Sequence, residues 1–116
     1  MPYIKLETTE AIAADTKRGL CEQLSRLCAA EIGKPEQYVQ AVVADQVAML
    51  HGGAAGPAAF VDVRSIGGLS PKVCQALAAK VCALLDRDLG VPGSRVYLNF
   101  TDVAAARWGH DGGTFG

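Results

Sequence analysis

Residues 33–39, GKPEQYV, and residues 90–96, GVPGSRV, lie 57 positions apart and share a glycine, a proline two residues later and a final valine. Glycine followed closely by proline is typical of the end of a helix, and each valine begins an apolar segment typical of a strand. Upstream, the same offset aligns the apolar residues of two helical patterns, Leu20, Leu24 and Leu27 with Leu77, Val81 and Leu84. The chain therefore repeats the order strand, helix, turn, strand in halves 1–57 and 58–116 of one domain, 1–116.

In the first half, residues 3–8 predict a strand and residues 9–15 a connection. Asp15 or Thr16 is expected to cap a helix that ends near Ile32, because Gly33 follows as a terminating residue. Residues 39–44 are rich in β-branched side chains and predict a buried strand.

In the second half, residues 59–64 predict a strand and residues 65–68 a turn. Ser70 and Pro71 have the order of an N-cap and a first helical residue, so a helix is expected from there to Leu89. Residues 96–102 predict the last strand, and residues 108–116 are rich in glycine and polar side chains.

Two consecutive strand–helix–strand units predict an α/β fold with two parallel strand pairs joined by right-handed crossovers. Both helices are then expected on one face of a four-stranded sheet. The strands carry more apolar residues than two helices are expected to cover, which predicts that further copies of the chain pack on the open face; copy number does not follow from this. The residues of this expected excess are Ile4, Leu6, Val42, Val61, Val63, Val96, Leu98 and Phe100.

Composition excludes several classes of partner. The formal net charge of −1 gives no basic surface for nucleic acid or an anionic membrane, and no apolar run approaches the ~20 residues of a membrane span. The N-terminus lacks the pattern of a cleaved signal peptide, so a cytoplasmic location is expected, with release without a signal peptide left open as the alternative. No spacing of the four cysteines and two histidines indicates a metal site, and the cysteines are expected to be free thiols near the core.

Pro2 directly follows the initiator methionine. If Met1 is removed, the nitrogen of Pro2 becomes a secondary amine at the start of a strand that pins it in place. Apolar surroundings and nearby positive charge lower the pKa of such an amine below the ordinary value of roughly 7.7–8.0, which would make it a general base near neutral pH. The alternative from these two residues alone is a tolerated proline at a frayed end.

A set of short motifs in a constant order resembles the macrophage migration inhibitory factor family of the tautomerase superfamily. The resemblance covers essentially the whole chain and rests on Met1-Pro2, Gly33-Lys34-Pro35, Asp45-Gln46, Ser65-Ile66-Gly67, residues 95–99 (RVYLN) and Gly113-Thr114-Phe115. It implies a pair of βαβ units assembled as a homotrimer with sites at subunit interfaces. It also implies keto–enol tautomerisation of phenylpyruvate or p-hydroxyphenylpyruvate, or of D-dopachrome, without a cofactor.

The resemblance carries over residue by residue. Pro2 matches the catalytic proline, Lys34 the substrate-binding lysine and Ile66 the residue whose backbone amide binds substrate. Tyr97 and Asn99 match a pair that an adjacent subunit contributes; being two positions apart on a strand, they face the same side. Without the resemblance, Lys34 is an ordinary turn lysine, and Tyr97 and Asn99 are ordinary strand residues.

Enolising a 2-oxo acid needs a base beside the reacting carbon and donors for the carboxylate and the developing enolate oxygen. The Pro2 amine would be that base, and Lys34 would both bind the anion and depress the pKa of the amine. The resemblance also implies a competing function, a cytokine-like ligand that binds a protein receptor and whose tautomerase activity is vestigial. A third possibility is an oligomer whose pocket is silent.

Overall fold

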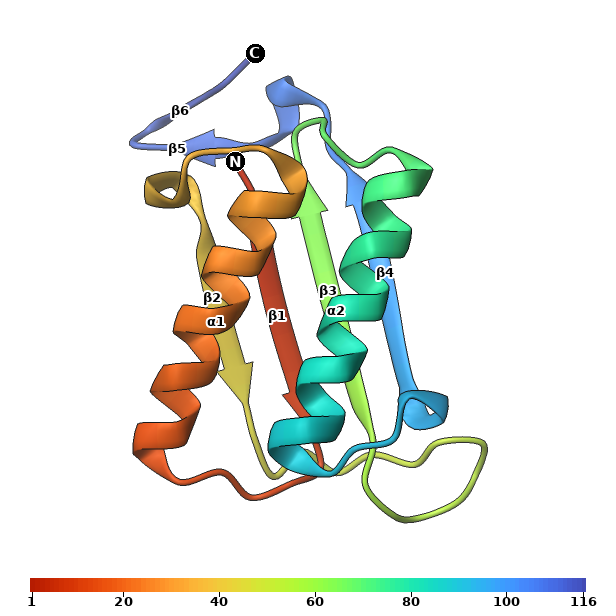
Figure 1. Cartoon of the computed structure of the whole chain (residues 1–116). Coiled ribbons are helices and arrows are strands. Elements are labelled where there is room, and N and C mark those ends of the chain that lie inside the picture. Colours follow the sequence, from red (N-terminus) through yellow and green to blue (C-terminus); the bar gives the residue numbers. More distant parts are fainter.

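The computed structural model describes residues 1–116 (Figure 1). Its four long strands are β1 (Tyr3–Thr8), β2 (Gln40–Ala44), β3 (Ala59–Ser65) and β4 (Val96–Asp102), and its two long helices are α1 (Ala14–Ile32) and α2 (Pro71–Leu89). Short 3-10 turns η1 (Glu36–Tyr38), η2 (Gly93–Arg95) and η3 (Ala105–Arg107) precede β2, precede β4 and follow β4. A small hairpin of β5 (Gly109–His110) and β6 (Gly113–Thr114) ends the chain. The expected elements are therefore present, within one residue at each strand end.

The four strands form one sheet in the order β2-β1-β3-β4, with β1–β2 and β3–β4 parallel and β1–β3 antiparallel. Figure 1 shows both helices on one face of this sheet, and it shows the N-terminus at the same end as the C-terminal hairpin. The α/β class, the two parallel pairs and the one-sided helix layer confirm the prediction.

The 57-residue offset is visible in the strand register. Tyr3 pairs with Gln40 in the first unit, and Phe60 pairs with Tyr97 in the second. Phe60 lies 57 positions after Tyr3, and Tyr97 lies 57 positions after Gln40. Because β1 and β3 are antiparallel, equivalent ends of the two units lie at opposite ends of the sheet.

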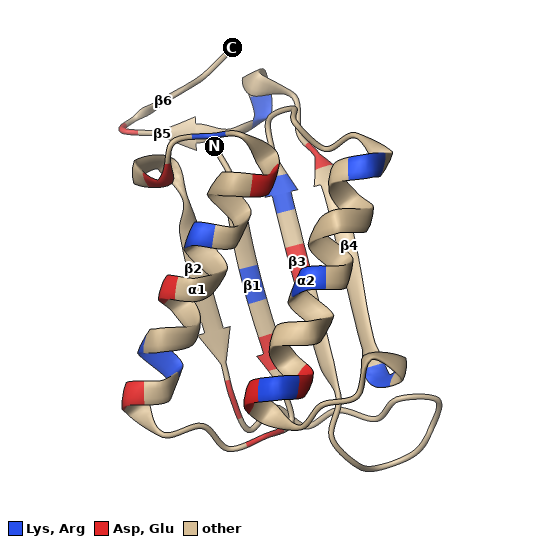
Figure 2. Ribbon diagram, viewed as in Figure 1, with Lys and Arg blue, Asp and Glu red and all other residues tan.

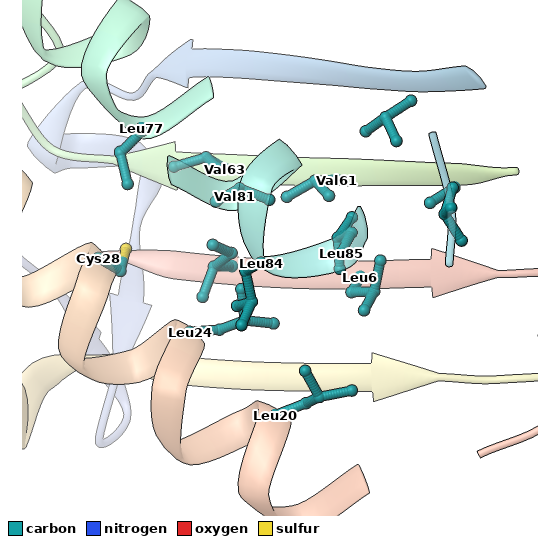
Figure 3. Packing of buried hydrophobic residues seen from close by; sticks show 14 of the residues in the cluster. Leu6, Leu20, Leu24, Cys28, Val61, Val63, Leu77, Val81, Leu84 and Leu85 are labelled. Atoms are coloured by element: carbon teal, nitrogen blue, oxygen red, sulfur yellow. The ribbon is translucent and has the colours of Figure 1, made fainter. Parts of the chain in front are cut away.

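Alternating side chains of the strands pack against the helices and form the core (Figure 3). Leu20, Leu24 and Cys28 of α1 are buried there, as are Leu77 and Val81 of α2. Both helices end as expected, at Gly33 and Gly90 with positive φ angles of 77° and 67°, which glycine adopts without a side-chain clash. The core therefore lies entirely on the helix side of the sheet. The four cysteines are free, and Cys28 is the one fully buried among them.

The start of α1 differs from the prediction. The N-cap is Ala13, which makes no side-chain capping bond, and Asp15 lies within the first turn instead of capping it. The preceding residue is held from outside, because Asp45 Oδ2 accepts a 3.0 Å hydrogen bond from the backbone N–H of Ile12 and Oδ1 pairs with Lys17 at 2.9 Å. A carboxylate 33 positions away therefore anchors the residue before the N-cap, and no side chain caps the first turn itself. In contrast, Ser70 caps α2 as predicted, accepting from the backbone N–H of Val73.

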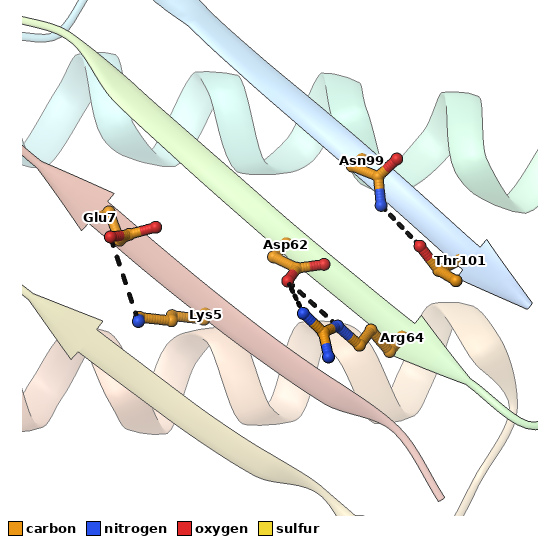
Figure 4. A network of polar contacts seen from close by, with 6 residues as sticks. All are labelled: Lys5, Glu7, Asp62, Arg64, Asn99 and Thr101. Carbon is orange, nitrogen blue, oxygen red and sulfur yellow. Dashed lines mark hydrogen bonds and ion pairs between the residues drawn. The ribbon is translucent and has the colours of Figure 1, made fainter. Parts of the chain in front are cut away.

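The expectation of an apolar open face is wrong. Strand side chains alternate between the faces, and seven of the eight residues named for that excess belong to the core cluster or pack against it; only Val42 does not. The open face instead carries polar pairs, including Lys5 with Glu7, Asp62 with Arg64, and Asn99 with Thr101 (Figure 4). Apolar excess therefore gives no argument for oligomerisation.

Charged residues of both signs are spread over the helices and the strands, and Figure 2 shows no extended region of one sign on the helix side. Neither helix combines the length and apolarity that crossing a bilayer requires.

Candidate active site

Pro2 is fully buried where the chain enters β1, and its carbonyl oxygen accepts a 3.1 Å hydrogen bond from the backbone N–H of Gln40. It forms part of the wall of a cavity of about 460 Å³. The other lining residues come from η1, from the start of β2 and from the C-terminal hairpin: Met1, Gln37, Tyr38, Val39, Gln40, Trp108, Gly109, His110 and Phe115. The terminus of β1 is thus pinned, as expected, and opens onto a space large enough for a small aromatic acid.

Lys34 and the segment after β3 approach each other at this end of the sheet. Gly68 has a φ of +79°, and a Cβ atom there would lie 2.6 Å from Ile32 Cγ2 and 3.7 Å from Lys34 Cε. Only glycine allows this approach, so the turn after β3 rests directly on the end of α1. Lys34 is half-buried and has no carboxylate within 4.0 Å of its ammonium group.

The backbone N–H of Ile66 is also without a partner in the chain. Around it, the side chain of buried Ser65 donates to the carbonyl of Gly67 at 2.7 Å, and the N–H of Gly67 donates to Asp102 Oδ1 at 2.9 Å. No hydrogen bond within the chain uses the Ile66 N–H. Two hydrogen bonds therefore hold the turn while the Ile66 N–H stays available.

The N-terminal amine is electrostatically tuned in the direction that a base requires. Burial lowers the pKa of the Met1 α-amino group below 8.0, and the positive charge of Lys34 lowers this pKa further. Burial raises the pKa of the Cys28 thiol to about 11, so this sulfur is protonated at neutral pH.

Tyr97 and Asn99 lie far from Pro2 in the same chain. Tyr97 pairs with Phe60 across β4 and β3, and Phe60 pairs with Glu7 across β3 and β1. Tyr97 is therefore level with Glu7, which is five residues along β1 from Pro2, a distance of about 17 Å. Tyr97 is 65% exposed and packs against His51 with ring centroids 4.7 Å apart. Asn99 donates to Thr101 Oγ1 at 2.6 Å. The chain therefore brings Pro2, Lys34 and Ile66 to one end of the sheet and leaves Tyr97 and Asn99 elsewhere.

From the sequence, Trp108 is expected either to form a pocket wall or to cover a sheet edge, and the other walls from the C-terminal segment are not predicted. Trp108 lines the cavity, which agrees with the first alternative, and His110 and Phe115 stack with ring centroids 5.6 Å apart. A signal was present, since three aromatic rings in nine residues are unusual in a glycine-rich tail, but the segment lacks the periodicity that would place them.

Comparison with known proteins decides the family. The model of the family described as macrophage migration inhibitory factor (MIF) matches residues 1–116. The chain belongs to the MIF family. This family is part of the tautomerase superfamily, so the resemblance read from the motifs is confirmed. The MIF homolog of Trichuris trichiura is 36% identical over 118 residues, covering 99% of this chain and 100% of that protein.

Solved structures agree with the MIF fold. The MIF homologue from Prochlorococcus marinus superposes with a TM-score of 0.93 at 36% identity, covering 98% of this chain and 99% of that one. A crystal structure of Pt0534 inactivated by 2-oxo-3-pentynoate superposes with a TM-score of 0.83 at 26% identity, covering 96% and 93% of the two chains.

Proposed function

We propose that this MIF-family protein is a cofactor-independent keto–enol tautomerase of aryl 2-oxo acids, such as phenylpyruvate, p-hydroxyphenylpyruvate or a D-dopachrome-type substrate. Its general base is the Pro2 amine freed by removal of Met1. One observation carries the proposal: Pro2 is buried at a cavity wall where burial and Lys34 both lower the pKa of the terminal amine. This shift belongs to the amine of Met1, one residue before Pro2, and we infer that Lys34 acts in the same direction on the Pro2 amine once Met1 is removed.

The proposed reaction moves one proton. The Pro2 nitrogen takes a proton from the carbon next to the ketone, and the electrons of that C–H bond form the enolate. Protonation of the enolate oxygen gives the enol, and the reverse sequence regenerates the ketone. Lys34 and the unpaired Ile66 N–H offer a charge and a donor to the carboxylate, which orients that carbon toward the amine. A placed base of this kind contributes about 10²- to 10⁴-fold to the rate.

Chemistry recorded for a similar structure supports a 2-oxo acid site. Pt0534 was inactivated by 2-oxo-3-pentynoate, which is itself a 2-oxo acid with an electrophilic alkyne. We infer that the cavity beside Pro2 accepts the same functional group.

We further propose that the working form is a homotrimer in which Tyr97 and Asn99 of one copy complete the cavity of the next. Three features support it: these two side chains lie far from Pro2 in their own chain, Tyr97 is mostly exposed, and β2 and β4 are edge strands with unpaired backbone groups. Family membership agrees with this assembly. A trimer predicts a mass of about 36 kDa by light scattering, three times the 12.1 kDa of one chain.

The direct test follows enol–keto conversion of phenylpyruvate by ultraviolet absorbance on protein whose intact mass shows a free Pro2. Conversion that disappears when the terminal amine is acylated supports the base and its position together. Absence of conversion by protein with a free Pro2 contradicts the enzyme proposal. The receptor-binding alternative then gains weight, and it predicts partner binding that survives acylation.

A further inference from the structure

A second cavity of about 300 Å³ adjoins the one at Pro2, with which it shares Trp108 and Gly109. Its remaining walls are Tyr3, Arg64, Val103 and Arg107. This cavity differs from the first in its charge, because two arginine side chains and two aromatic rings line it, whereas no lysine or arginine lines the cavity at Pro2.

Arg64 is held in place but keeps donors free. Its Nε and Nη2 donate to the same oxygen of Asp62, Oδ2, at 3.1 and 2.8 Å, and its Cζ lies 5.7 Å from the centre of the Tyr3 ring (Figure 4 shows the pair with Asp62). Its Nη1 makes no hydrogen bond within the chain. A guanidinium has five donors, so fixing it from one side leaves a preorganised edge for a further anion.

Arg107 has no counter-charge in the chain. It lies in η3, with no carboxylate within 4.0 Å of its guanidinium. Asp62 is the one carboxylate paired with the arginines of this cavity, since Asp102 is used by the N–H of Gly67. Two positive charges, of Arg64 and Arg107, against the one negative charge of Asp62 leave the cavity with an excess of one positive charge.

We propose that this cavity binds a second carboxylate of the substrate, so that the preferred substrate is an aryl 2-oxo acid with a second acidic group. The inference rests on the proposed function for the site at Pro2. Lys34 and Ile66 take the carboxylate next to the ketone, Trp108 flanks the ring, and Arg64 and Arg107 take the distal carboxylate. Planar guanidinium groups match the geometry of a carboxylate better than a lysine does.

Trp108 offers a readout that needs no turnover, because it is the chain's one tryptophan and lines both cavities. Its fluorescence is followed while phenylacetate or 4-carboxyphenylacetate is added. The two ligands differ by one carboxylate, and neither has a ketone to react. The unaltered protein should bind the diacid about tenfold more tightly, equivalent to about 1.4 kcal/mol.

Three variants locate the carboxylate. Arg107→Gln should reduce the affinity ratio of the two ligands toward one, and so should the double variant Asp62→Asn with Arg64→Gln, which leaves net charge unchanged. Asp62→Asn alone should raise the ratio, because Arg64 loses its competing anion. Arg18→Gln is the matched control, since Arg18 is 86% exposed on α1 and should leave the ratio unchanged.

Equal affinity for the two ligands in the unaltered protein overturns the proposal, as does a ratio that persists in both arginine variants. A fluorescence response to neither ligand, together with no heat of binding by calorimetry, overturns it as well. Phenylpyruvate conversion is measured separately on the unaltered protein. Its absence contradicts the proposed function, whereas the ligand titrations decide the anion site by themselves.

Discussion

Position for position, the first half of the chain places Pro2 and Lys34 where the second half places Ala59 and Val91. Ala59 and Val91 are buried and apolar, so at these positions the second half contributes packing alone. The strand register is the same in both halves, and the backbone positions are equivalent. The difference teaches that the repeated frame does not itself create the candidate site: position 2 lies at the chain terminus and can carry an amine, whereas Ala59 is internal, and Lys34 adds a charge where Val91 has none.

On the later strand of each half, it is the second half that carries the candidate site residues. β4 carries Tyr97 and Asn99 where β2 carries Gln40 and Val42. Because β1 and β3 are antiparallel, the polar pair of the second half lies toward the opposite end of the sheet from Pro2. We infer that the two halves supply complementary groups, which meet only when copies of the chain assemble.

The largest expected effect is on turnover, and it distinguishes Pro2 from the equivalent residue of the second half, Ala59. Pro2→Gly replaces the ring-held secondary amine by a primary amine on a flexible residue, and it should reduce kcat/KM for phenylpyruvate by about 10²- to 10⁴-fold, because the base is no longer held in position. Ala59→Gly at the equivalent position should keep turnover and lower the free energy of unfolding by only about 0.5–1 kcal/mol. Steady-state kinetics and urea unfolding measure the two effects. Similar kinetic losses in both variants would remove the distinction between the halves.

The next effect tests the contact that holds the turn after β3 against α1. Gly67→Ala adds a methyl group at a φ of +75° with nothing within 4 Å, so it should cost about 1–2 kcal/mol of unfolding free energy. Gly68→Ala has a similar φ and also meets Ile32 at 2.6 Å, so about 1–3 kcal/mol more is expected. Urea unfolding at one fixed protein concentration compares them. Equal losses would mean that the turn does not depend on this close approach.

A smaller effect concerns the charge at Lys34. Lys34→Gln should raise KM for phenylpyruvate by about tenfold, since a charge-assisted contact to the carboxylate is lost. Removing a positive charge also raises the pKa of the neighbouring amine, so the acid limb of kcat/KM against pH should move to higher pH. The control is Lys72→Gln on the exposed surface of α2. A raised KM with an unmoved acid limb would separate substrate binding from tuning of the base.

The smallest effect concerns a feature that the halves share. Asp45 and Asp102 are 57 positions apart; Asp45 directly follows β2 and Asp102 is the last residue of β4. Asp45 accepts a hydrogen bond from the backbone N–H of Ile12, and Asp102 accepts one from that of Gly67. The Ile12 N–H, and then Lys17, lower the pKa of Asp45 below 3.8. Its stabilisation is therefore present above the unfolded-state pKa and is lost as the pH falls through the lower folded-state value.

Asp45→Asn should accordingly lower the urea midpoint at neutral pH, and the gap to the unaltered protein should shrink below pH 3.8. Asp86→Asn, an exposed carboxylate of α2, corrects for the general loss of a negative charge. A gap that stays constant with pH would show that the ionised carboxylate is not what holds Ile12.

Sequence predicted the parts of the fold that have a period. β1, α2 and β4 have the predicted bounds, because alternation, capping residues and terminating glycines are local signals. The predicted cap of α1 was wrong, because the residue that anchors the chain just before this helix, Asp45, is far away in the sequence. The open face was misjudged because strand alternation, applied to Ile4 and Leu6, would have placed both beneath the helices.

The site was less accessible than the fold. Short motifs predicted Pro2, Lys34 and Ile66 as site residues, and the structure brings the three to one end of the sheet. The path of the C-terminal tail across the end of the sheet decides two features of the site. These are the cavity walls from Trp108 to Phe115 and the placing of Arg64 and Arg107 in one cavity. No local pattern encodes that path, so the aromatic residues of the tail and the two arginines could be noticed in the sequence but not placed.

Subunit mixing tests the central claim, that each site joins Pro2 of one copy to Tyr97 and Asn99 of another. Two inactive proteins, Pro2→Gly and the double variant Tyr97→Phe with Asn99→Ala, are unfolded together and refolded, and native mass spectrometry verifies mixed assemblies. An intact site then needs its proline from one parent and its polar pair from the other, so about one quarter of wild-type activity should return. Mixed assemblies that remain as inactive as both parents would contradict the claim and place the whole site within a single chain.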